Sequence, residues 1–374
     1  MKTLKVTLKQ HTPLIHFQHD QYGATLRASE VKPKLDKFIL EKLEHDPFII
    51  EKALLHCRKK VSKHELDESG VAFKYIFCKK EENWMSSSDS LSYKLRVVTD
   101  EEDFVDLTMN SGNFPFLLCN INKKEDDFVQ FSFYKKIDLV FTSKYPNLID
   151  KIVQYLDDFL AITNFGSRQN KGFGSFFTEN KTLNDFKKNL SSSYHFVWTK
   201  NFTYGENLNG FNTLFKNLDK TYKSLKSGIA VRHIPSSLSL YFKESDQVAL
   251  KNYIKKGIPP SQTDYIRACL GIANELIVGK DCMALIEHCS RNDDEKIERY
   301  QSPIIFKIFD QNIFVLYRDT FDFVSNETFK FSFVDKDTKK RVLYPPQTLI
   351  VPQKFDVEKF LTIYLKDGYK KIEL

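Results

Sequence analysis

The residues best suited to bind an anion lie close together in one stretch, residues 165–177. Glycines alternate there with cationic, amide and hydroxyl side chains: Gly166, Ser167, Arg168, Gln169, Asn170, Lys171, Gly172, Phe173 and Gly174. Glycine has no Cβ atom, so this backbone can adopt positive φ angles and present successive N–H groups to a ligand. Arg168 and Lys171 would supply charge, and Phe173 would offer a stacking face if its ring points outward. These properties suit a polyanion, although tight connectors use the same residue types.

Two expected elements flank this glycine loop. Residues 146–160 have apolar side chains at the spacing of one helix face, and residues 173–178 are aromatic and β-prone. The predicted order is therefore helix, loop, strand. A Walker loop and a dinucleotide-binding fingerprint both follow a strand, so the glycine loop belongs to neither class.

A second group of cations lies near the N-terminus. Alternating apolar residues predict a strand over residues 2–10, and Pro33 is expected to begin a helix with an apolar inner face. Arg27, Lys32 and Lys34 flank that expected helix start. Unpaired N–H groups at a helix start favour anions, so the sequence predicts a second anion site there.

Composition limits the class of protein. The chain has 374 residues, of which 41% are hydrophobic, enough for two domains. No run of about eighteen apolar residues occurs, so we expect a cytoplasmic protein without a membrane partner. The formal net charge is +7, and residues 181–256 hold thirteen Lys or Arg against five Asp or Glu, a net of +8. Such a basic segment is typical of a nucleic-acid-binding surface or of a solvated lysine face.

The predicted elements repeat one pattern. In the first half, further strands are expected at residues 71–78, 93–98, 114–119 and 128–141. The second half restarts after Leu190, with expected strands at residues 194–202, 237–242, 303–309, 313–317 and 329–333 and helices at residues 211–226, 246–255, 263–278 and 357–365. This order predicts an α+β fold of tandem ferredoxin-like (RRM-like) domains with insertions, over residues 1–185 and 190–374.

The two cationic stretches together resemble the RAMP superfamily of CRISPR proteins. Its members have a Thr-Pro-hydrophobic strand end, an Arg-x-Ser-Ser-x-Lys-Gly helix start and a Gly-x-Arg-x-x-x-Gly-[Phe/Tyr]-Gly loop. Here Thr12-Pro13-Leu14, residues 27–33 and residues 166–174 match, except that Glu30 replaces the second Ser and Pro33 the Gly. Residues 267–271 and 298–305 are similar to segments of the family of the first Cmr subunit, from type III-B effectors.

The resemblance implies a non-catalytic RNA-binding subunit of a type III CRISPR RNA-guided effector complex that targets RNA. Its partners would be guide RNA and target RNA, near the guide 3′ end, together with other effector subunits. Contacts would come from Arg27, Lys32, Lys34 and the glycine loop. A positive track would continue over outward-facing side chains at Lys216, Lys220, Lys223, Lys226, Arg232 and His233.

Two other interpretations remain open. His16 and His19 follow the first strand, and a histidine suits 2′-OH activation, as in a metal-independent endoribonuclease that cuts CRISPR precursors. A basic protein-interaction module is the third interpretation. The six cysteines lack zinc-site spacing and no metal-nuclease motif is present, so we expect neither a metal nor another cofactor.

Overall fold

The computed structural model describes most of the chain: residues 1–15, 24–44, 90–91, 93–107, 109–110, 128–129, 132–228, 234–243, 245–256, 264–278, 281–290, 296–340 and 344–374. The expected strands at residues 71–78 and 114–119 lie outside these ranges. Within them, no helix is long and apolar enough to cross a membrane.

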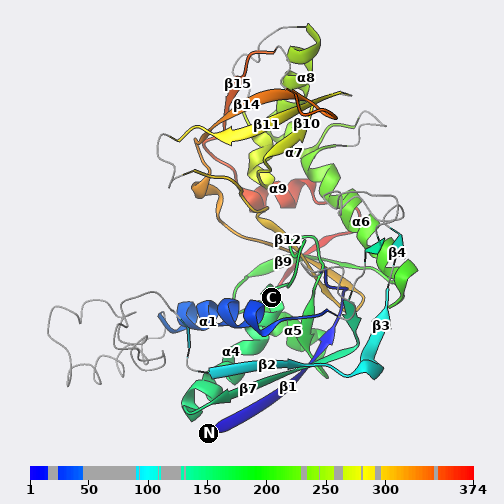
Figure 1. Cartoon of the computed structure of the whole chain (residues 1–374), viewed down its shortest axis with the longest axis vertical. Coiled ribbons are helices and arrows are strands. Elements are labelled where there is room, and N and C mark those ends of the chain that lie inside the picture. The colour runs from blue at the N-terminus through cyan, green and yellow to red at the C-terminus, as the bar shows by residue number, and fades with distance from the viewer. Residues whose placement is uncertain are drawn as a thin grey trace, which may run out of the picture.

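The first half forms a ferredoxin-like unit (Figure 1). Its main elements are β1 (Lys2–Gln10), α1 (Ala28–Glu44), β2 (Tyr93–Val98), β7 (Lys136–Ser143), α4 (Pro146–Ile162) and β8 (Phe176–Thr178). The strands pair antiparallel in the order β2-β7-β1-β8, which is the split βαβ arrangement predicted for this half. The expected strand at residues 128–141 divides into β5 (Phe128–Val129), β6 (Ser132–Tyr134) and β7.

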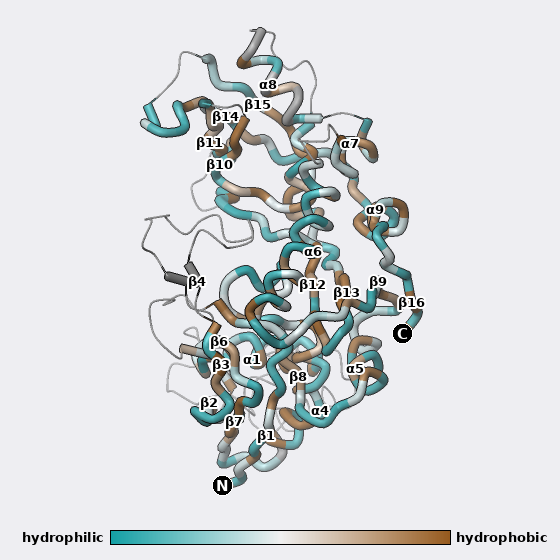
Figure 2. Tube along the Cα trace, turned by 90° about the vertical axis from the view of Figure 1, so that its right-hand side faces the viewer, coloured by the Kyte–Doolittle hydropathy of each residue, from teal (hydrophilic) through white to brown (hydrophobic). Residues whose placement is uncertain are grey.

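The second half repeats the arrangement with β9 (Phe196–Asn201), α6 (Leu208–Lys226), β12 (Ile304–Phe309), β13 (Asn312–Tyr317), α9 (Val357–Tyr364) and β16 (Lys370–Glu373). Its sheet has the order β12-β13-β9-β16, again antiparallel. The prediction of tandem ferredoxin-like units with insertions is therefore confirmed. Figure 2 shows α6 alongside β12 and β13.

Two insertions in the second unit build a separate sheet at the top of Figure 1, in the order β10-β11-β14-β15. They contain α7 (Ser237–Phe242), α8 (Asp246–Lys256), the 3-10 helix η5 (Ile266–Leu270), β10 (Glu275–Ile277), β11 (Cys282–His288), β14 (Thr328–Asp335) and β15 (Gln347–Ile350). The predicted strand at residues 237–242 is wrong, since this segment is helical. The predicted helix at residues 263–278 is also wrong, because only η5 is helical there and β10 follows it.

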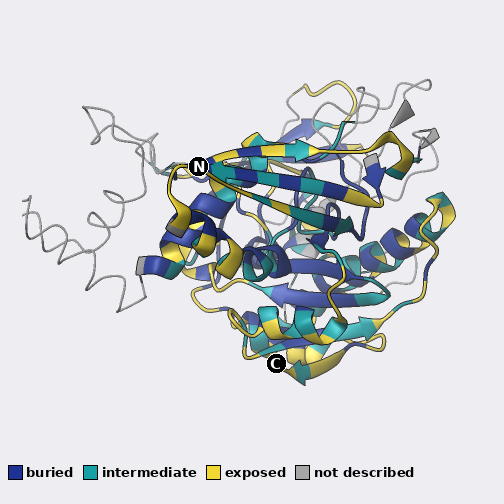
Figure 3. Cartoon of the chain, turned by 90° about the horizontal axis from the view of Figure 1, so that it is seen from below, coloured by how far each residue is buried: buried dark blue, intermediate teal, exposed yellow. Residues whose placement is uncertain are grey.

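The two ferredoxin-like units share one apolar core (Figure 3). Helix α5 (Leu183–Leu190) supplies Phe186, whose ring centroid lies 4.6 Å from that of Phe309 and 5.0 Å from that of Phe314. Phe177 of β8 packs edge-on against Phe186 at 5.1 Å. Helix α5 thus joins the first sheet to the second, and the domain boundary placed between residues 185 and 190 stays a prediction.

Helix α1 begins earlier than the sequence suggested. The N–H groups of Glu30 and Val31 both donate to the carbonyl of Arg27 at 3.0 Å and so make the first turn. The helix therefore starts at Ala28, and Pro33 lies inside it. The prediction of Pro33 as the first helical residue is therefore wrong. The expected inner face is confirmed, since Leu35 and Ile39 are fully buried.

Candidate nucleic-acid interface

The glycine loop has the backbone conformation that its sequence predicts. Gly166, Gly172 and Gly174 have φ angles of +75°, +88° and +64°, and Arg168 also lies in the left-handed region at 59°. The need for glycine comes from the chain itself. A Cβ atom at Gly166 would lie 2.6 Å from the carbonyl oxygen of Ile15, and one at Gly174 would lie 2.0 Å from that of Phe165.

The N–H groups of the three glycines are used inside the protein. Gly166 donates to Oε1 of Glu30 at 2.7 Å, Gly172 to the carbonyl of Gln169 at 3.3 Å and Gly174 to the carbonyl of Pro13 at 2.9 Å. The expectation that these groups face an external anion is therefore wrong. A carboxylate of the chain already occupies the position of an anion at Gly166.

Helix α1 and the glycine loop meet through Glu30 and Lys34. Lys34 Nζ lies 2.9 Å from Glu30 Oε1 and 3.0 Å from Gln169 Oε1, and it donates to the Asn164 carbonyl at 3.4 Å. The helix start and the glycine loop therefore lie on one side of the unit. Arg27 is exposed at this edge, and the side chain of Lys34 is 33% exposed.

Lys32 makes contacts that hold α1 in place. Its ammonium lies 2.6 Å from the buried Asp36 carboxylate, donates to the Leu91 carbonyl at 2.8 Å and lies 3.9 Å from the centre of the Tyr93 ring. Burial raises the pKa of Asp36, and the hydrogen bond from Lys32 opposes that rise. Lys32 therefore joins α1 to the segment before β2.

The side chains of Lys171 and Phe173 are turned inward, against expectation. Lys171 Nζ lies over the Tyr222 ring, is buried and has no hydrogen-bond partner within the described part of the chain. Burial, reinforced by the charges of Lys226 and Arg168, holds the pKa of Lys171 well below its ordinary value. Phe173 is fully buried and stacks on Phe215 of α6, with ring centroids 3.7 Å apart. Its predicted outward stacking face is wrong because α6 covers the loop.

The loop also binds the second ferredoxin-like unit. Asn164 Nδ2 donates to the carbonyls of Gln169 (2.7 Å) and Phe306 (2.8 Å), so one amide holds both units. Asn170 Nδ2 donates to the Ser302 carbonyl at 3.1 Å, and its own carbonyl accepts from Phe306 N–H at 3.2 Å. The glycine loop is therefore a clasp between the two units, a role that the sequence did not reveal.

Two second-half segments with family likeness converge beside this clasp. Gly271, with a φ of +103°, lies so close to residues 300–302 that a Cβ would be 3.1 Å from Ser302 N. Lys226 Nζ donates to the carbonyls of Leu270 (3.0 Å) and Gly271 (2.6 Å), and Tyr222 OH donates to Leu270 at 2.8 Å. The predicted outward orientation of Lys226 is wrong, and burial lowers its pKa to about 7.

Some of the other residues predicted for the positive track are exposed, and others are paired or lie outside the described residues. Lys216 and Lys220 are exposed on α6 as predicted, whereas Lys223 lies 2.6 Å from the Asp219 carboxylate. Arg232 and His233 lie outside the described residues, as do the candidate catalytic His16 and His19. Arg27 and Lys34 at the start of α1, together with the partly exposed Arg168 of the adjoining glycine loop, are called the cationic edge of the first unit.

The protein has two ferredoxin-like sheets, and a basic glycine loop that precedes the last strand of the first sheet contacts both units. This arrangement defines a RAMP-type protein. Two family models match the chain: the Cmr1 N-terminal domain over residues 1–229 and the Cmr1 C-terminal domain over residues 234–373. The chain therefore belongs to the Cmr1 family. Proteins of this family are subunits of the Cmr module of type III-B CRISPR effectors.

Other comparisons add a distant likeness. The crystal structure of Cmr1 from Pyrococcus furiosus in its apo form is similar, with 13% sequence identity and a TM-score of 0.42. The match covers 86% of this chain and 89% of that one. The search of curated proteins found no match.

Proposed function

We propose that this Cmr subunit binds RNA without cutting it, contacting guide and target RNA near the guide 3′ end within the effector complex. The observation that carries the proposal is the cationic edge formed by Arg27, Lys34 and Arg168. Its cations come from two segments that Glu30 and Gln169 hold together. Cations fixed at separate points of one edge suit successive phosphates of a strand.

The edge would recognise the charge and shape of the RNA backbone. Phe173 is buried, so base stacking at this residue has no place in the mechanism. The exposed Lys216 and Lys220 of α6 would extend the path, because α6 packs directly on the glycine loop through Phe215. Sequence selection would belong to pairing between guide and target strands.

A matched pair of loop variants tests the proposal. Arg168→Glu reverses a charge at the loop tip, whereas Lys171→Met removes a buried amino group. Binding of labelled single-stranded RNA would be measured by fluorescence anisotropy over a salt series in EDTA, with thermal unfolding as the check on folding. We expect Arg168→Glu to weaken binding about tenfold or more and to lower the salt slope by roughly 0.7 per lost phosphate contact. Lys171→Met should stay within about twofold of the unsubstituted protein.

The opposite outcomes are equally clear. Unchanged affinity in a folded Arg168→Glu protein would refute the cationic edge as an RNA site. A discrete cut in the RNA, abolished by His16→Ala or His19→Ala, would replace the binding role with that of a metal-independent endoribonuclease.

A further inference from the structure

A pocket of about 390 Å³ opens where the two ferredoxin-like units meet. Its walls come from the end of β1, the start of β7 and the turn after β8 in the first unit. The second unit contributes Glu206, which precedes α6, and Asp310 in the turn between β12 and β13. None of the cationic edge residues lines it.

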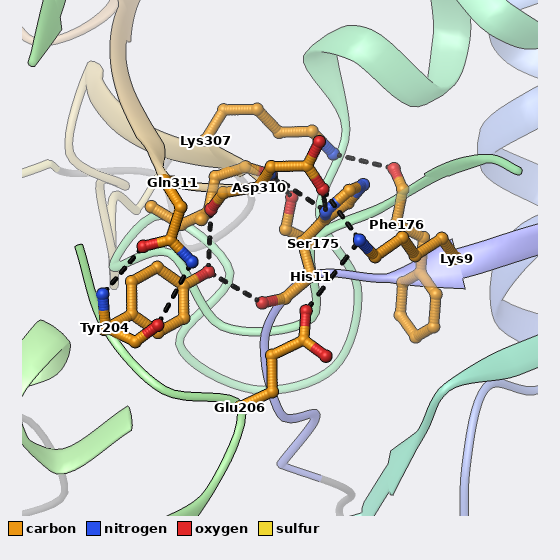
Figure 4. A network of polar contacts seen from close by, with 10 residues as sticks. Lys9, His11, Ser175, Phe176, Tyr204, Glu206, Lys307, Asp310 and Gln311 are labelled. Atoms are coloured by element: carbon orange, nitrogen blue, oxygen red, sulfur yellow. Dashed lines mark hydrogen bonds and ion pairs between the residues drawn. The ribbon is translucent and has the colours of Figure 1, made fainter. Parts of the chain in front are cut away.

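A polar network fixes one wall of this pocket (Figure 4). The N–H of Asp310 donates to Nδ1 of His11 at 3.0 Å, and the Tyr204 hydroxyl lies 2.9 Å and 3.2 Å from the carbonyl oxygens of Asp310 and His11. The Gln311 side chain accepts from Tyr204 N–H at 2.7 Å and donates to its carbonyl at 3.1 Å. Because these contacts are internal, the wall is formed before any ligand arrives.

The pocket carries charges of both signs. Its lysines are Lys9, Lys135, Lys136 and Lys181, and its carboxylates are Glu179, Glu206 and Asp310. Contact with His11 and then with Lys9 holds the pKa of Asp310 well below its usual range, so this carboxylate is charged. Lys9 Nζ lies 2.8 Å from Asp310 and 3.8 Å from Glu206, so the nearest cation to Glu206 in the described residues is a distant one.

Lys135 is the cation most open to a ligand. It is exposed, and among the described residues it forms no ion pair. Lys136 and Lys181, by contrast, pair with Glu179 at 2.6 Å and with Asp157 at 3.1 Å. Among the residues that the structure describes, a ligand anion could therefore bind Lys135 without displacing a carboxylate.

We infer that this pocket binds one ribonucleotide unit. Its volume lies at the lower end of the range of about 300–1,000 Å³ for small-ligand pockets, which excludes a duplex. The lysines would hold a phosphate, and the carboxylates of Glu206 and Asp310 would accept hydrogen bonds from ribose hydroxyls. A bare phosphate would instead meet those two carboxylates with repulsion. The inference uses residues outside the cationic edge, so it and the proposed function can fail separately.

The test is calorimetric titration of the full chain with adenosine 5′-monophosphate, its 2′-deoxy analogue, inorganic phosphate and a 5′-phosphorylated hexa-adenylate RNA. Lys135→Glu removes the open cation, Glu206→Gln keeps the side-chain shape without the charge, and Lys354→Ala is the control at an exposed lysine outside the pocket. We expect Lys135→Glu to lower ribonucleotide affinity about tenfold or more. Glu206→Gln should reduce the preference for the ribose form, and Lys354→Ala should bind normally.

Each result has one meaning. Binding of the monophosphate with this variant pattern supports the pocket with a free nucleotide as ligand. Binding of the hexamer alone, with the same pattern, supports it with the end of a strand as ligand. The inference is overturned if inorganic phosphate binds as well as the nucleotide, if both variants bind like the control, or if no probe binds at millimolar concentration.

Discussion

Replacing Gly174 by alanine tests whether the glycine loop is a clasp or a ligand cradle. In a cradle, the added methyl group would block a ligand and leave the fold intact. In the structure, the Cβ atom would lie 2.0 Å from the Phe165 carbonyl oxygen and 2.8 Å from its carbon. Backbone atoms cannot turn aside as a flexible side chain can, so the loop itself would have to move.

The expected loss of stability follows from three contributions. Left-handed backbone costs an alanine about 1–2 kcal/mol. Moving Gly174 also weakens its two backbone hydrogen bonds, from Phe165 N–H and to the Pro13 carbonyl, both 2.9 Å long. At about 0.5–1.5 kcal/mol each, these bring the total to about 2–5 kcal/mol. This is a large share of the about 5–15 kcal/mol that stabilises a typical protein.

Gly368→Ala is the matched control. Gly368 has a φ of +87°, but the nearest atom to its added Cβ would be Lys200 Cε at 3.8 Å, so only the backbone cost of about 1–2 kcal/mol applies. Urea denaturation followed by tryptophan fluorescence would give both free energies of unfolding. Equal losses in the two variants would refute the clasp, as would a fully stable Gly174→Ala protein that has lost RNA binding.

Two buried lysines give further predictions. The pKa of Lys226 is about 7 in the folded protein and about 10.4 when unfolded, so the unfolded chain binds more protons between these values and stability should rise with pH there. The contribution of Lys226 to the slope of unfolding free energy against pH should reach at most about 1.4 kcal/mol per pH unit. Denaturation at pH 7, 8 and 9 should show a smaller slope in Lys226→Met. An unchanged slope would contradict the lowered pKa of Lys226. Lys171→Met should leave the free energy of unfolding unchanged or raise it by up to about 2 kcal/mol, because it removes a buried amino group that has no hydrogen-bond partner among the described residues. A loss above about 1 kcal/mol would show that its contact with Tyr222 outweighs the cost of burial.

Regular patterns in the sequence predicted most of both ferredoxin-like units. The segment 237–242 shows why one element was missed. Its serines and leucines alternate like a strand, yet Ser236 caps a helix by accepting from Ser239 N–H at 3.1 Å, and Leu238 is fully buried. Local capping and tertiary packing together overrode the pattern.

In the candidate site too, the sequence predicted some features and missed others. Glycine spacing predicted the backbone of the loop, because conformation at these residues is a local property. The orientation of Phe173 depends on Phe215, more than forty residues later, and no local pattern reports such a contact. A signal for the internal anion did exist, since Glu30 stands where the family motif has a serine. That carboxylate proved to be the acceptor for Gly166.

The clasp bears directly on how the proposed RNA site would work. Arg168 lies between two anchored residues, since Gly166 is bound to α1 through Glu30 and Asn170 is bound to Ser302 of the second unit. Any rotation of one unit against the other would break these contacts or move Arg168 away from Lys34. The spacing of the cationic edge therefore depends on the interface between the units. Substitutions that loosen this interface should weaken RNA binding even where they remove no positive charge.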